Sequence, residues 1–203
     1  MLIKKDKVVY TSNQNRIGGE IMNLTKLFDT QKLLDAAIVE KKGLEGRDML
    51  PEKILALQVE LGECANEWRG FKFWSEDMKP RTVVYEGLND GINEPTKNLL
   101  LEEYVDCLHF ILSIGLDLKT EDAEVYSHKY KSVVEQFSEI FMCVTAIARN
   151  FSVQCSEDMS GDYCDLISEF ISLGEMIGFT WDQIEQAYYD KNEINHSRQN
   201  NGY

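Results

Sequence analysis

Apolar side chains recur every three or four positions along most of the chain, which is the spacing of one face of an α-helix. The first such stretch runs from Leu24 to a break at Lys42-Gly43. The second opens at Pro51, because proline is well tolerated at the first position of a helix, and it ends at Gly70. Four later stretches have the same period and cover residues 97–119, 121–150, 161–176 and 180–197. Thr180 is predicted to cap the last helix.

Two parts of the chain lack this periodicity. Residues 1–22 are polar and rich in Asn and Lys. Residues 75–98 contain two prolines and two glycines among residues of mixed polarity, which indicates a loop or an insertion. No segment alternates as a β-strand does, and no repeat of fixed period occurs. The predicted fold is an all-α helical bundle, in one domain over 23–203 with an insertion at about 75–98.

The run Gly18-Gly19-Glu20-Ile21-Met22 gives the N-terminal segment two interpretations. Codons for Gly-Gly-Glu can spell a purine-rich ribosome-binding site, in which case Met22 is the native start and residues 1–22 are an extension outside the fold. The alternative is an ordinary N-terminal arm. Mass spectrometry of native protein beginning at Met1 would exclude the first interpretation.

Charge and composition exclude some classes of partner. The formal net charge of −14 argues against nonspecific nucleic-acid binding, because a phosphate backbone would be repelled. No apolar run approaches the roughly 20 residues that span a bilayer, and no charged-then-apolar leader opens the chain. The five cysteines form no CxxC and no zinc spacing, which indicates reduced thiols. We expect a soluble cytoplasmic protein without a membrane or nucleic-acid partner.

Two acidic pairs at one-turn spacing are the first candidates for chemistry. Glu60 and Glu63 flank the apolar stripe of the second helix, and Glu103 and Asp106 lie in a helix that is apolar nearly all round. A carboxylate in apolar surroundings is costly unless it is paired, protonated or bound to a cation. Four carboxylates on two helices therefore predict a cage for a hard cation, and all-oxygen ligation suits Mg²⁺. For the first pair alone, a solvated helix face is the alternative.

The C-terminal segment carries cations on one face of a helix. Lys191, Asn195 and Arg198 occupy positions i, i+4 and i+7 and could grip a polyphosphate, although a frayed polar tail is the alternative. An aromatic cluster follows the first acidic pair; there Trp68 continues the core stripe, while Trp74 lies past a glycine and is freer to serve a ligand.

Together these motifs resemble the dimeric, all-α dUTPase family of bacteria, phages and some protozoa, within the all-α NTP pyrophosphohydrolases. The resemblance spans about residues 24–203. The matching elements are Gln31-Lys32-Leu33-Leu34-Asp35, Glu60-Leu61-Gly62-Glu63-Cys64-Ala65-Asn66-Glu67, Phe71-Lys72-Phe73-Trp74-Ser75, Glu102-Glu103-Tyr104-Val105-Asp106-Cys107-Leu108-His109-Phe110, and Lys191-Asn192-x-x-Asn195-x-x-Arg198-Gln199-x-x-Gly202-Tyr203. The two acidic motifs are shared with the wider group of all-α pyrophosphohydrolases. The C-terminal motif and the Trp-Ser element make the resemblance specific to dUTPases.

The resemblance implies a homodimer that hydrolyses dUTP, and as a second substrate dUDP, with Mg²⁺ as cofactor. One of Glu60 or Glu63 would act as general base. The implied Mg²⁺ ligands are Glu60, Glu63, Glu103 and Asp106. The implied phosphate contacts are Lys191, Asn195, Arg198 and Tyr203, and the implied uracil contacts are Gln31 and Trp74.

Other functions fit the same residues. A MazG-like or dCTP-directed pyrophosphohydrolase would use the same carboxylates and would turn over dCTP or canonical NTPs at comparable rates. A non-catalytic regulatory helical protein would bind Mg²⁺ or a basic partner and turn over no nucleotide. The phage-like character of the resemblance also leaves room for an enzyme that sequesters a repressor-type protein partner.

Overall fold

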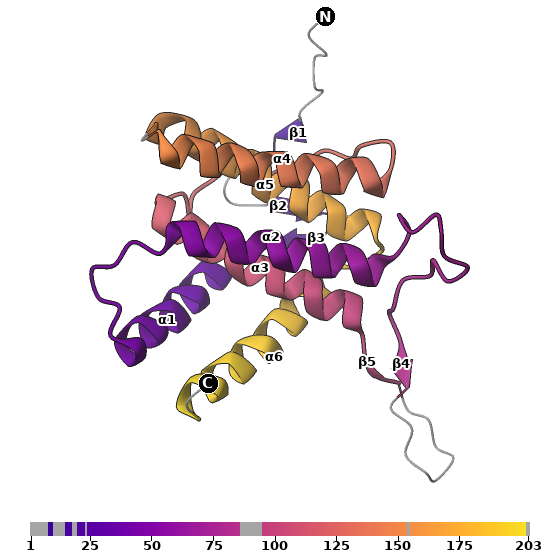
Figure 1. Cartoon of the computed structure of the whole chain (residues 1–203), viewed down its shortest axis with the longest axis horizontal. Helices are drawn as coiled ribbons and strands as arrows, with labels where there is room; N and C mark the ends of the chain where they lie inside the picture. The colour runs from indigo at the N-terminus through magenta and orange to yellow at the C-terminus, as the bar shows by residue number, and fades with distance from the viewer. Residues whose placement is uncertain are drawn as a thin grey trace, which may run out of the picture.

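Six helices account for most of the residues that the computed structural model describes, which are 8–9, 15–17, 20–22, 24–85, 95–153 and 155–201. They are α1 (Leu24–Lys42), α2 (Leu50–Trp68), α3 (Leu99–Leu118), α4 (Val133–Ser152), α5 (Ser156–Met176) and α6 (Trp181–Asn200), as Figure 1 shows. The all-α prediction is confirmed. No described helix combines the length and the apolarity that crossing a membrane would require.

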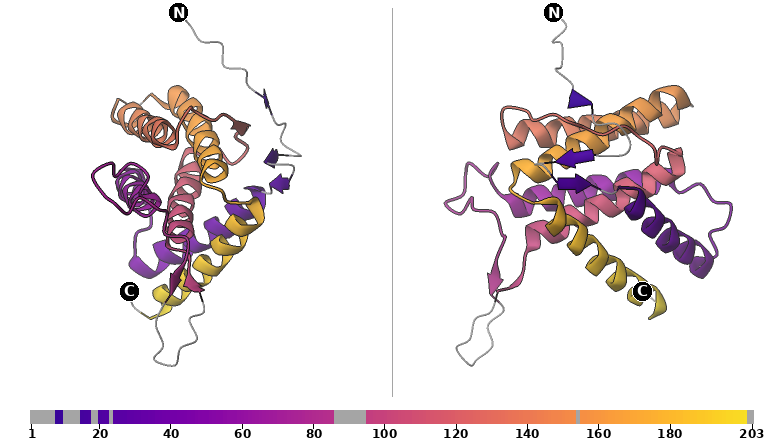
Figure 2. Two further views of the ribbon diagram at one scale, coloured as in Figure 1. Left: turned by 90° about the vertical axis from the view of Figure 1, so that its right-hand side faces the viewer. Right: turned by 180° about the vertical axis from the view of Figure 1, so that it is seen from behind.

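Helix α3 lies at the centre of the molecule. It packs along α2, contacts α5, and is crossed by α1 and α6, while α4 pairs with α5 on one side (Figures 1 and 2). Eleven of its residues are buried, because its apolar side chains surround the whole helix. Tyr104 of α3 stacks on Phe170 of α5 with ring centroids 4.3 Å apart. Helices α1, α2, α5 and α6 therefore pack directly on α3, whereas α4 packs on α5 and α2.

Side-chain caps fix where the helices begin. Pro51 lies in the first turn of α2, as predicted. Asn98 accepts a hydrogen bond from the Leu101 amide at the start of α3. Thr180 caps α6 as predicted, within a reciprocal capping box that includes Gln183. Arg69 ends α2 in the left-handed region, at φ 64°.

The predicted helix over 121–150 is wrong over residues 121–132, because α4 begins at Val133. Residues 120–132 instead contain a turn at 121–122 and a short strand that packs against α5, and several of their amide groups bond to side chains. The Tyr126 amide donates to Ser168 Oγ at 3.1 Å, and the His128 amide donates to Ser172 Oγ at 3.0 Å. Polar groups of another helix thus replace the internal hydrogen bonds that a helix would have made.

Short strands, which the sequence pattern does not predict, join parts of the chain outside the helices. They form three antiparallel pairs: β1 (Val8–Val9) with β6 (Tyr126–Ser127), β2 (Asn15–Ile17) with β3 (Glu20–Met22), and β4 (Val84–Tyr85) with β5 (Pro95–Lys97). Met22 is buried against the core. The five cysteines are free thiols, of which three are buried.

Candidate active site

The packing of α2 against α3 brings acidic side chains together. Glu60 and Glu63 of α2 and Glu103 of α3 each offer one carboxylate oxygen, and these oxygens lie within 4.8 Å of one another. We call these three residues the carboxylate cluster. Because all its donors are oxygen, the cluster suits a hard divalent cation such as Mg²⁺.

Asp106, the fourth predicted ligand, lies beside the cluster and pairs with a lysine. The Lys191 Nζ donates to Asp106 Oδ2 at 2.5 Å and to Glu102 Oε1 at 3.4 Å. Lys191 is only 8 % exposed, so α6 presents its ammonium group to the α3 carboxylates. In this structure Lys191 therefore compensates acidic charge next to the cluster.

The surroundings of the carboxylate cluster disfavour the ionised forms of Glu60 and Glu103. Burial raises the pKa of Glu60 to about 7, and the neighbouring charges of Asp106 and Glu63 add to the effect. Burial also raises the pKa of Glu103 to about 7, again with Asp106 and Glu63 contributing. Carboxylates crowded in this way are stabilised when a cation joins them, so the donor set and its electrostatics both fit a bound Mg²⁺.

Lysines act to lower the pKa values of Asp106 and Glu102, the two acidic residues beside the cluster. Burial raises the pKa of Asp106, although the hydrogen bond and charge of Lys191 act against it. For Glu102 burial acts in the same direction, but Lys97 and Lys191 outweigh it and hold the pKa below its ordinary value. Glu102 is thus fixed as a charged partner of two lysines, and Lys97 Nζ lies 2.9 Å from its Oε2.

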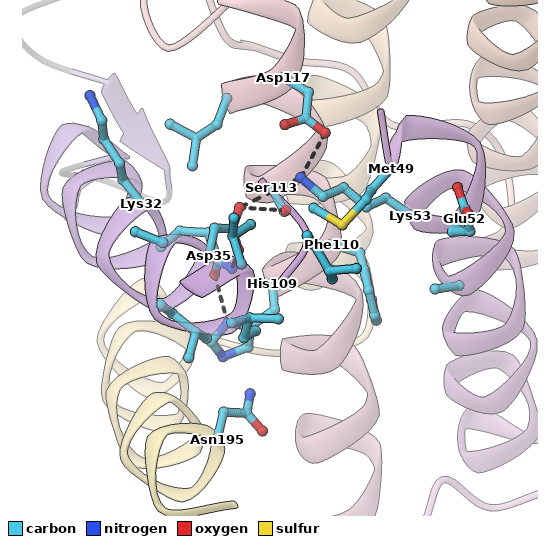
Figure 3. Close-up of a pocket in the computed structure, with 18 of the residues that line it drawn as sticks. Lys32, Asp35, Met49, Glu52, Lys53, His109, Phe110, Ser113, Asp117 and Asn195 are labelled. Atoms are coloured by element: carbon cyan, nitrogen blue, oxygen red, sulfur yellow. Dashed lines mark hydrogen bonds and ion pairs between the residues drawn. The ribbon is translucent and has the colours of Figure 1, made fainter. Parts of the chain in front are cut away.

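A cavity of about 1160 Å³ opens next to the cluster, between α1, α2, α3 and α6 (Figure 3). This is large enough for a nucleotide, because small-molecule pockets commonly span about 300–1,000 Å³. Five predicted site residues line it, and they come from all four helices: Gln31, Glu60, Asp106, Asn195 and Arg198. The structure therefore places acidic, amide and cationic groups around one space.

One wall of the cavity is a hydrogen-bond network around Gln31, whose side chain is only 3 % exposed. Gln31 Nε2 donates to Asp35 Oδ1 at 2.7 Å. Gln31 Oε1 lies 2.8 Å from His109 Nδ1 and accepts from the Tyr188 hydroxyl at 2.9 Å. Ser113 Oγ donates to the other Asp35 oxygen at 2.6 Å. Asp35 is not among the predicted site residues, although its position four residues after Gln31 on a helix favours this contact.

Trp74, a predicted uracil contact, lies apart from this group. Trp74 is 65 % exposed, stacks edge-on with Phe71 and Phe73, and does not line the cavity described above. Trp68 is half-buried and packs against Phe137, with centroids 5.9 Å apart. Tyr203 lies outside the described residues.

The fold and the site define the class of protein, a helical bundle that presents acidic pairs inward from neighbouring helices next to a ligand-sized cavity. A family model described as dUTPase matches residues 23–93 and 91–203. The chain therefore belongs to this dUTPase family, whose fold is all-α and whose members are of the nucleotide pyrophosphohydrolase type. The comparison with curated proteins finds no match.

Proposed function

We propose that the protein is a Mg²⁺-dependent dUTP diphosphatase, which converts dUTP and water to dUMP and pyrophosphate and also accepts dUDP. The observation that carries this proposal is that Glu60 belongs to the carboxylate cluster and also lines the cavity, together with the neighbouring Asp106. Family membership supports the reaction class. Amide and apolar side chains that suit a base and a sugar, among them Gln31, Leu34 and Ile38, also line the cavity.

Glu60, Glu63 and Glu103 would hold the cation, with Asp106 released from Lys191 to join them. Bound Mg²⁺ would offset triphosphate charge and lower the pKa of a coordinated water. Glu60 or Glu63 would accept a proton from the attacking water through a carboxylate oxygen. Lys191 and Arg198 would then stand beside the phosphates, where their charges stabilise the negative charge that builds on the leaving group.

The test is pyrophosphate release from dUTP, dUDP, dCTP, dTTP and UTP, with Mg²⁺ and with EDTA. We expect Mg²⁺-dependent turnover of dUTP and its loss by about a hundredfold or more in Glu63→Gln, since removing a general base or a ligand costs that much. Glu63 is exposed, so the variant should fold. Glu193→Gln, an exposed glutamate elsewhere on α6, is the control and should stay within about twofold of wild type.

The same assay separates the alternatives. Turnover of dCTP or UTP at rates comparable to dUTP would favour a pyrophosphohydrolase of broader or different specificity. Absence of turnover for every nucleotide, with Mg²⁺ binding retained, would favour a regulatory protein and contradict the proposal.

A further inference from the structure

His109 has a buried ring nitrogen without a partner at the cavity wall. Its side chain is 6 % exposed and lines the cavity. Nδ1 contacts Gln31, whereas Nε2 has no hydrogen-bond partner among the described residues and is closed to solvent. Buried polar atoms are nearly always paired, so a group left unpaired in a cavity wall points to a ligand.

The carboxylate of Asp35 fixes which way the Gln31 amide points. An ionised carboxylate can only accept hydrogen bonds, so the Gln31 atom 2.7 Å from Asp35 Oδ1 must be the NH₂ group. The reversed amide would set its oxygen against that carboxylate. Gln31 Oε1 is therefore the atom that faces His109 and Tyr188.

The Gln31 oxygen in turn fixes the tautomer of His109. A carbonyl oxygen can only accept, so Nδ1 must carry the hydrogen in this contact. Burial and, after it, the charge of Lys191 lower the pKa of His109 to about 3, although a hydrogen bond with the Tyr188 backbone acts in the opposite direction. The imidazole is then neutral near pH 7, and Nε2 carries a lone pair. Figure 3 shows Asp35 and Asn195 on opposite sides of His109.

We propose that His109 Nε2 accepts the N3–H of the uracil ring, and that Asp35 is the positioning residue that makes it an acceptor through Gln31. This inference rests on the proposed uracil nucleotide substrate and adds the atom that selects the base. Uracil carries a hydrogen on N3, whereas cytosine carries a lone pair there. Cytosine would therefore place two lone pairs against each other, which a site built around a hydrogen bond rejects strongly.

The kinetic test compares kcat/KM for dUTP and dCTP in wild type and Asp35→Asn. The asparagine can accept or donate, so Gln31 is no longer held in one orientation, and we expect the dUTP/dCTP ratio to fall by about tenfold or more. Asp190→Asn is the matched control, because Gln186 Nε2 donates to Asp190 Oδ1 at 2.8 Å in the same i, i+4 arrangement on the exposed face of α6, and neither residue lines the cavity. Its ratio should stay within about twofold of wild type.

A readout without turnover tests the same assignment. Long-range ¹H–¹⁵N spectra of ¹⁵N-histidine-labelled protein report which ring nitrogen is protonated. We expect His109 to be protonated on Nδ1 in wild type. In Asp35→Asn we expect a mixture of the Nδ1-protonated and Nε2-protonated tautomers. Addition of dUMP should shift the Nε2 resonance, and addition of dCMP should not.

The outcomes separate this inference from the proposed function. A wild-type protein that prefers dUTP to dCTP, with an unchanged dUTP/dCTP ratio in Asp35→Asn, overturns the inference alone. A wild-type protein with no preference over dCTP overturns the inference and also favours the pyrophosphohydrolase of broader specificity. Protonation of Nε2 in wild type also overturns it. A wild-type protein that hydrolyses no nucleotide overturns the proposed function, while the spectra still test the His109 tautomer.

Discussion

Glu60 and Glu103 should make the effect of Mg²⁺ on stability depend on pH. Their pKa values in the folded protein, about 7, exceed the ordinary value of 4.5, mainly because of burial and then because of neighbouring carboxylates. The protonated forms are thus favoured by folding, and this stabilisation is fully present below about pH 4.5 and is lost as the pH rises through about 7. A cation binds the ionised forms, so its stabilising effect should grow over the same window.

Thermal unfolding at pH 5.5 and pH 8, in EDTA and in saturating Mg²⁺, measures this prediction. A hundredfold excess over the dissociation constant stabilises by about 2.7 kcal/mol, which corresponds to about 5–10 °C in Tm for a chain of this size. We expect a shift of that order at pH 8 and a much smaller one at pH 5.5. Glu60→Gln should weaken the pH dependence. Equal increases in Tm on addition of Mg²⁺ at pH 5.5 and at pH 8 would contradict the prediction.

Individual site residues were predictable where their surroundings are set by one helix. The apolar neighbours of Glu103 and Asp106 in sequence indicate half-buried carboxylates, and the structure places Glu103 with Glu60 and Glu63. The pairing of Asp106 with Lys191 was not predictable, since 85 residues separate them and the contact depends on how α6 crosses α3. The contacts of the Gln31 oxygen with His109 and Tyr188 were likewise not predictable, because both partners come from other helices.

Two helical glycines provide a test at the scale of secondary structure. A Cβ on Gly115 of α3 would lie 2.2 Å from the hydroxyl oxygen of Tyr163, which is fully buried and donates to the Ile111 carbonyl. Gly115→Ala should therefore lower the free energy of unfolding by about 1–3 kcal/mol, because the α3–α5 contact cannot widen without loss of packing. Urea unfolding measures the change.

Gly161 of α5 is the matched control. A Cβ there would meet nothing within 4 Å, so Gly161→Ala should raise the free energy of unfolding by about 0.5–1 kcal/mol through the higher helix propensity of alanine. A neutral Gly115→Ala, or the same sign for both substitutions, would show that the close approach of α3 and α5 is not required.

The helices themselves were largely predictable, because most ends are marked by local signals. The break at Lys42-Gly43, Pro51 and Thr180 each mark a boundary that the structure has at or next to that position. The start of α4 was not predictable in this way. Residues 121–132 have helical periodicity, but the Tyr126 and His128 amides bond to Ser168 and Ser172, which lie about 40 residues further along the chain. A segment with helical periodicity can remain non-helical when side chains from distant parts of the chain offer equivalent hydrogen bonds to its amides.

The whole molecule divides into parts that should respond differently to a nucleotide. The most extensive helix contacts join α2 to α3 and α4 to α5, whereas α1 and α6 pack against α3 and against each other (Figure 1). The cavity lies on the side of the molecule where α1 and α6 meet α2 and α3. Local opening of α1 or α6 would therefore disrupt the cavity, while local opening at the ends of α4 would leave it intact.

Hydrogen–deuterium exchange should report this division. With dUMP and Mg²⁺ at about a hundredfold excess over the dissociation constant, exchange through openings that destroy the cavity should slow by about a hundredfold. We expect this in α1 and α6, and we expect the fast-exchanging amides near the C-terminal end of α4 to keep their rates. Those amides are an internal control for a general change in exchange conditions. Equal slowing in α4 would mean that the nucleotide stabilises the bundle as a whole. Slowing in α4 alone would place the ligand outside the cavity between α1, α2, α3 and α6.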